Sequence, residues 1–169
     1  MALGGNLGAS LAAALGVGLA VTVAGVAVAH DDPPPKGQLS PAQKAAYDRH
    51  ANFEKLGAAF KALNDELRKS NPNVATVQAQ TKTMAALAKA LPTWFPRGSG
   101  VEVRPKSEAK ANIWTDAAGF NAKASVSLAE INKLNDAALK GDMGAVKAQV
   151  RAAGGACKGC HDVYREKKS

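Results

Sequence analysis

Apolar residues recur at intervals of three and four along most of this chain, and that spacing restricts what the chain can fold into. The clearest run comprises Phe53, Leu56, Phe60, Leu63 and Leu67. An α-helix has 3.6 residues per turn, so residues spaced in this way form one apolar stripe on its surface. The alternating pattern of a half-buried strand does not occur over a useful length, and only 5% of the residues are aromatic. The sequence therefore predicts an all-α fold.

Turn-forming residues divide the periodic part of the chain into four predicted helices. The first begins after Ser40, which can cap it, with Pro41 at the first helical position and Gln43 completing a capping box. Turn residues at 70–73 end this helix, and the second helix is predicted over residues 74–91.

The third predicted helix begins at Ser107 and carries an apolar stripe that ends at Leu134. Asp142 can cap the fourth helix, which is predicted to run to about Tyr164. Four amphipathic helices with mostly short turns predict an antiparallel four-helix bundle, which we place at residues 40–169.

One connection in this bundle is much longer than the others. Proline and glycine interrupt the helical pattern from Pro92 to Pro105. Connections in helical bundles normally span about two to eight residues, so a longer one usually has a function. Trp94 and Phe95 lie inside this segment, and we expect it to fold back over an apolar surface.

Residues 1–29 have the character of a signal peptide. They contain no charged side chain, include a long apolar run and end in Ala27-Val28-Ala29, small residues typical of a signal-peptidase site. We predict cleavage there, followed by a proline-rich tether at residues 30–39 and a soluble mature protein in the periplasm. An uncleaved membrane anchor is the alternative, because the apolar run is just long enough to span a bilayer.

The most distinctive chemistry lies in the segment Cys157-Lys158-Gly159-Cys160-His161. Cys-x-x-Cys-His is the attachment signature of haem c. On a helix, the two cysteines and the histidine share one face. The thiols of Cys157 and Cys160 can form covalent thioether bonds to one haem, and the imidazole of His161 can then bind the iron as its proximal axial ligand.

Three other uses of the two cysteines fit the sequence less well. A thioredoxin-type redox pair normally lies in a βαβ unit, which this chain lacks. A zinc site would need further cysteines or a nearby histidine, and the other histidines, His30 and His50, are far upstream. A disulfide between residues three apart on a helix would be strained and would close almost no loop.

Several segments beyond the haem motif form a family pattern. They are residues 49–53 (RHANF), residues 94–100 (WFPRGSG), residues 113–114 (IW) followed by Phe120, and residues 157–165 (CKGCHDVYR). With these segments, most of the predicted mature chain resembles the cytochrome c′ family. The resemblance implies a monohaem c-type cytochrome whose single haem c lies within the bundle.

The resemblance also implies roles for individual side chains. It places Phe53 at the distal face of the haem, where a residue without a lone pair leaves the iron five-coordinate and high-spin. Such an iron would bind NO or CO reversibly, while bound O₂ would lack a stabilising donor. Three further implications concern a propionate contact from Arg49, packing beside the haem by Trp94 and Trp114, and a proximal position for Arg165. The alternative for each of the two arginines is a solvated surface charge, and for each tryptophan an ordinary core position.

The alternative is a dedicated electron carrier with a six-coordinate, low-spin haem. His50 is the strongest candidate for a sixth ligand, because it precedes Phe53 by three residues and lies on nearly the same helix face. Met84 and Met143 are weaker candidates, since they lie on apolar stripes. In either case we expect electron transfer activity and no enzymatic activity, because the sequence shows no pattern typical of a catalytic site.

The formal net charge of +8 predicts a basic surface, which could steer association with an acidic redox partner of unknown identity. A nucleic acid is not an expected partner, because lysine and arginine are spread over every predicted helix and the protein is predicted to be exported. The family resemblance also allows a homodimer formed through the first two helices.

Overall fold

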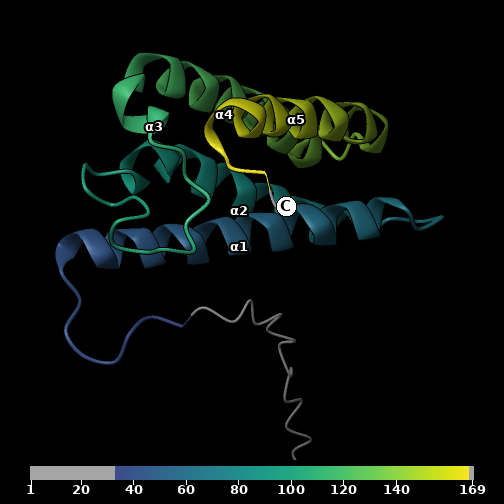
Figure 1. Ribbon diagram of the computed structural model, residues 1–169. Helices are drawn as coiled ribbons and strands as arrows, with labels where there is room; N and C mark the ends of the chain where they lie inside the picture. Colours follow the sequence, from purple (N-terminus) through teal and green to yellow (C-terminus); the bar gives the residue numbers. More distant parts are fainter. Residues whose placement is uncertain (1–32, 168–169) are drawn as a thin grey trace, which may run out of the picture. The chain divides into compact units, whose positions relative to one another are not determined.

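A computed structural model describes residues 33–167, so the predicted signal peptide at residues 1–29 lies outside the described part of the chain. The prediction of an all-α fold is confirmed, and the described residues contain no strand. The helical elements, shown in Figure 1, are α1 (Pro41–Leu67), α2 (Val74–Ala90), the 3₁₀-helix η1 (Leu91–Trp94), α3 (Asn112–Thr115), α4 (Ala117–Leu139) and α5 (Met143–Tyr164).

Side-chain caps confirm the predicted starts of the first and fourth helices. At α1, the Gln43 N–H donates to the Ser40 hydroxyl (3.2 Å), and the Ser40 N–H donates to the Gln43 side-chain oxygen (3.0 Å). At α5, the Ala145 N–H donates to the Asp142 carboxylate (2.9 Å). Each cap provides an acceptor for a backbone N–H group that the first helical turn leaves without one.

The prediction that the third helix begins at Ser107 is wrong. The segment before Asn112 is not helical, because its backbone pairs with the end of α5: the Lys110 N–H donates to the Tyr164 carbonyl (3.1 Å). The helix that follows is also interrupted at Asp116. The Asp116 carboxylate accepts a hydrogen bond from the Gly119 N–H (3.1 Å) and so caps α4 as a new helix.

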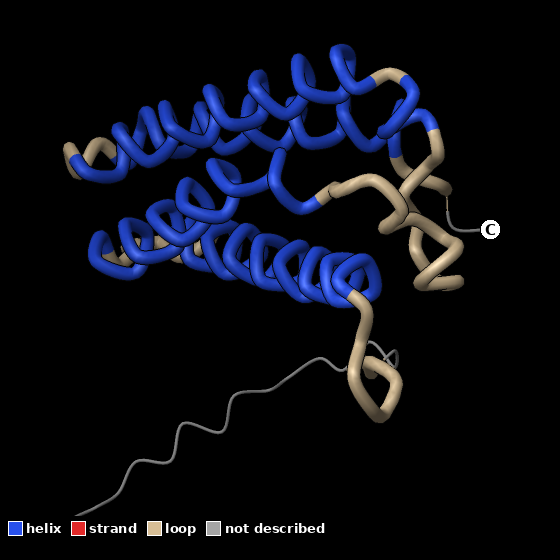
Figure 2. Tube along the Cα trace, turned by 90° about the vertical axis from the view of Figure 1, so that its left-hand side faces the viewer, coloured by secondary structure: helices blue, strands red, loops and turns tan. Residues whose placement is uncertain are grey.

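The four long helices form the predicted antiparallel bundle. Short turns join α1 to α2 and α4 to α5, and α2 packs beside α4 (Figures 1 and 2). Residues 95–111, here called the crossover loop, connect η1 to α3. Figure 2 shows this loop at the same end of the bundle as the end of α5. None of the described helices is both long and apolar enough to cross a membrane.

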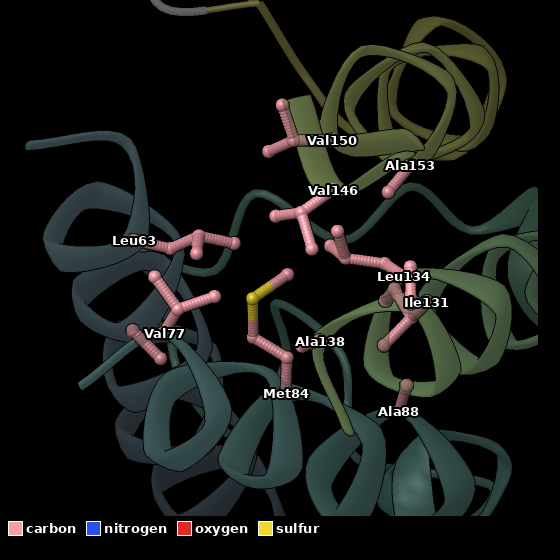
Figure 3. Close-up of a cluster of buried hydrophobic side chains, with 12 residues drawn as sticks. Leu63, Val77, Met84, Ala88, Ile131, Leu134, Ala138, Val146, Val150 and Ala153 are labelled. Carbon is pink, nitrogen blue, oxygen red and sulfur yellow. The ribbon is translucent and has the colours of Figure 1, made fainter. Parts of the chain in front are cut away.

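Side chains from all four long helices meet in one cluster, here called the bundle core. Figure 3 shows Leu63 of α1 and Met84 of α2 facing residues of α4 and α5 across this cluster. Both side chains are at most 1% exposed. The buried residues of the bundle core are Ala59, Leu63, Val77, Met84, Ala88, Ile131, Leu134, Ala137, Ala138, Val146, Val150 and Ala153.

Candidate functional site

The Cys-x-x-Cys-His motif lies in the last two turns of α5. Both cysteines are half-buried free thiols, and His161 is exposed. Cys157 packs against the bundle core, whereas Cys160 packs against a second apolar cluster. The two thiols therefore lie where two separate apolar clusters approach each other.

We call the second apolar cluster the loop-end cluster, since η1 and α3 contribute to it. Its buried members are Leu91, Trp94, Ile113, Phe120, Ala124 and Tyr164. Phe53 of α1 packs against this cluster, and its ring meets Trp94 edge to face with the centroids 5.2 Å apart. Phe95 of the crossover loop also contacts Phe53, at 6.2 Å between centroids.

The residues around the two cysteines suit a covalently bound apolar group. Half-buried Leu56 packs against the bundle core, and half-buried Leu87 packs against the loop-end cluster. Together with Phe53 they provide apolar surface from α1 and α2, on the same two clusters that the thiols contact. The donor set of two thiols and one imidazole, bordered by this surface, fits the predicted haem c.

The electrostatic surroundings favour this use of the motif over the alternatives. Burial raises the pKa of both Cys157 and Cys160, so neither thiol has the lowered pKa typical of a thioredoxin-type redox pair. Partial desolvation of the imidazole and the nearby Arg165 cation lower the pKa of His161, which favours the neutral imidazole that binds a metal. Within residues 33–167, no group of three or more His, Cys, Asp or Glu side chains could hold a metal ion such as zinc.

A surface hollow of about 460 Å³ lies beside His161. Arg165, which was predicted on the proximal side, lines this hollow together with His161. Its guanidinium is held by Glu108, at 2.5 Å from Nε and from Nη2 to the same carboxylate oxygen. The remaining lining residues are Asp162, Glu166 and Lys167.

Arg49 is buried, with 4% of its surface exposed, and is not a solvated surface charge. Its guanidinium donates hydrogen bonds to the carbonyl oxygen of Trp94 and to both the hydroxyl and the carbonyl oxygen of Ser99. It also lies 3.4 Å from the Ser107 hydroxyl. The sequence did not indicate that Ser99 and Ser107 contact Arg49, although both serines lie in or beside the long connection between the second and third predicted helices.

The structure also shows the contacts of the other predicted haem neighbour, Trp114, and of the candidate sixth ligands. The indole N–H of Trp114 donates to the carbonyl oxygens of Phe95 and Pro96, both at 3.1 Å, and so holds the crossover loop. His50 is half-buried, with Nε2 at 3.4 Å from Oε1 of Glu54. The methionines considered as sixth ligands lie at the bundle core, Met84 buried inside it and Met143 packed against it.

Comparison with known proteins agrees with the family resemblance of the sequence. A family model described as Cytochrome C′ matches residues 44–165. A cytochrome c′ from Rubrivivax gelatinosus is 42% identical over 97 residues, which cover 57% of this chain and 74% of the relative.

Two solved structures resemble the fold closely. A cytochrome c′ described as having ligand-controlled dimer dissociation has a TM-score of 0.70 and 26% identity, with 78% of this chain and 100% of that chain covered. A nitric oxide complex of a cytochrome c′ variant from Alcaligenes xylosoxidans has a TM-score of 0.69, the same identity and the same coverage.

Proposed function

We propose that this chain, which belongs to the cytochrome c′ family, is a periplasmic electron-transfer protein that also binds NO or CO at a five-coordinate haem iron. As a member of the family, it binds one covalent haem c. The observation that carries the proposal is the position of the Cys157-x-x-Cys160-His161 motif between two apolar clusters, one of which contacts Phe53.

The roles of the motif follow from its chemistry. Cys157 and Cys160 would hold the haem through thioether bonds, and the imidazole of His161 would be the axial ligand. The haem supplies an iron atom that exchanges single electrons and can bind a diatomic gas. Arg165, held by Glu108, would place a positive charge beside the axial histidine.

Phe53 determines which ligands the distal face would accept. Its side chain has no lone pair and cannot bind iron. Its ring contacts Trp94 and Phe95, which adds further apolar bulk around it. An apolar, crowded distal face favours NO and CO over O₂, which depends more on a hydrogen-bond donor. The nitric oxide complex of the Alcaligenes relative supports this assignment.

The visible spectrum of the reduced holoprotein, recorded before and after addition of CO, tests the proposal. A five-coordinate haem gives broad high-spin bands that CO shifts. Sharp low-spin bands that CO leaves unchanged would refute the assignment of Phe53. They would support the six-coordinate alternative, for which His50 is favoured because it is half-buried on the helix that carries Phe53. A pyridine haemochrome without the c-type signature would refute covalent attachment.

Export and assembly complete the proposal. The character of residues 1–29 supports export with cleavage before the tether at residues 30–39. The relative with ligand-controlled dimer dissociation supports a homodimer, which we place at α1 and α2. The net charge of +8 supports an acidic redox partner. We assign the protein no catalytic residues, and Arg49 is proposed to contact a haem propionate.

A further inference from the structure

We infer that Arg49 is a positioning residue: its guanidinium fastens η1 and the crossover loop against Phe53 and so limits how fast a gas reaches the iron. The inference rests on the proposed function, because it concerns entry to the same open iron position. It goes beyond the proposed propionate contact, because it assigns to Arg49 a role that depends on protein atoms alone.

The guanidinium binds four separate oxygen atoms. Nη1 donates to the Trp94 carbonyl oxygen (3.2 Å) and to the Ser99 hydroxyl (2.9 Å). Nη2 donates to the Ser99 carbonyl oxygen (2.6 Å) and to the Ser107 hydroxyl (3.4 Å). Each Nη atom carries two N–H groups. The four oxygens match the four terminal N–H groups of Arg49, which leaves the Nε–H for the proposed propionate contact.

The hydrogen bonds from Arg49 to η1 and the crossover loop are here called the clamp. The rings of Trp94 and Phe95 connect the clamp to Phe53. The central guanidinium carbon of Arg49 lies 4.8 Å from the centroid of the Phe95 ring, a cation–π distance. Phe95 and Trp94 both contact the ring of Phe53 edge to face. A loop that is held by Arg49 therefore restrains the Phe53 ring, which would have to move aside for a gas to bind.

Burial makes the clamp dependent on arginine. Ser99 is fully buried, and burial together with Arg104 lowers the pKa of Arg49 to about 10, so the guanidinium stays cationic at neutral pH. A buried cation is costly unless its N–H groups find acceptors. The planar fork of arginine reaches several oxygens at fixed angles, whereas the ammonium group of lysine is a single point charge. Arg49→Lys therefore keeps the charge and removes the clamp.

The test measures CO association with the reduced holoprotein by stopped flow. We expect association to be at least about fivefold faster in Arg49→Lys and in Ser99→Ala, since each loses one or more buried hydrogen bonds. A smaller increase in the association rate is expected for Ser107→Ala, because the Ser107 hydroxyl oxygen of the wild type lies further from the guanidinium, at 3.4 Å. Ser125→Ala, which changes an exposed serine of α4, is the matched control and should keep the wild-type rate.

Hydrogen exchange distinguishes the clamp from a general loss of stability. The amides of Val103, Arg104 and Ser107 donate to carbonyl oxygens within the crossover loop. They should exchange faster in Ser99→Ala, while amides at the centre of α4 keep their wild-type protection. A propionate contact alone predicts no change in Ser99→Ala. Wild-type CO rates and loop exchange in both Ser99→Ala and Arg49→Lys would overturn the inference, whereas a wild-type protein that does not bind CO would overturn the proposed function.

Discussion

The ring of Phe53 gives the most direct test of the distal face. Phe53→Ala removes a half-buried ring whose centroid lies 5.2 Å from that of Trp94 and 6.2 Å from that of Phe95, in two edge-to-face contacts. Each such pair contributes about 0.5–1.5 kcal/mol beyond the burial of area. A gas that displaces the ring would therefore lose about 1–3 kcal/mol of these contacts on binding.

Without the ring, this penalty disappears, and CO should bind about 5- to 150-fold more tightly. The assay is a CO titration of the reduced holoprotein followed in the visible spectrum. Phe60→Ala is the control, because it removes another half-buried ring of α1 that packs against the bundle core. A CO affinity of Phe53→Ala within about twofold of wild type, or an equal gain in Phe60→Ala, would refute the distal role of Phe53.

Three further outcomes are expected. Phe53→Met would supply a thioether ligand, so the reduced protein should show sharp low-spin bands, and unchanged broad bands would count against the distal position. Glu108→Gln removes the carboxylate paired with Arg165, and the uncompensated charge should raise the reduction potential by on the order of 20 mV in a redox titration. The hydrogen bond to Asp116 raises the pKa of Tyr164 to about 12. The contribution of this hydrogen bond to the free energy of unfolding is therefore present below about pH 10 and is lost as the pH rises through about 12. Urea unfolding should show wild type more stable than Tyr164→Phe at about pH 9, with the difference reduced above about pH 12; an unchanged difference would contradict this linkage.

The parts of the site that depend on neighbouring residues could be predicted from the sequence. Cys157, Cys160 and His161 lie within five positions, so helical spacing alone brings them to one face. The caps at Ser40 and Asp142 are equally local, because each acts on a backbone N–H three residues later. These short-range relationships were sufficient to predict the starts of α1 and α5 and to place both thiols and the imidazole near the end of one helix.

The parts that depend on distant residues could not be predicted in the same way. Arg49 and Ser99 are separated by 50 positions, and nothing in the local sequence of either indicates that they meet. Glu108 and Arg165 are 57 positions apart, and their pairing accompanies the backbone contacts that keep residues 107–110 out of a helix. The composition around Ser107 suggests a helix start, but the tertiary contact with the end of α5 overrides that preference.

Irregular backbone is concentrated at the end of the bundle that carries the site, and there is a chemical reason for it. Within a helix, backbone C=O and N–H groups bind each other and are not free to bind anything else. At this end, the carbonyl oxygens of Trp94 and Ser99 instead accept hydrogen bonds from Arg49. The Tyr164 carbonyl oxygen accepts one from the Lys110 N–H. By leaving the helical pattern, η1, the crossover loop and the end of α5 provide the polar backbone atoms that fix a buried cation beside an apolar face. Four continuous helices joined by short turns would form the same bundle core but would lack these acceptors.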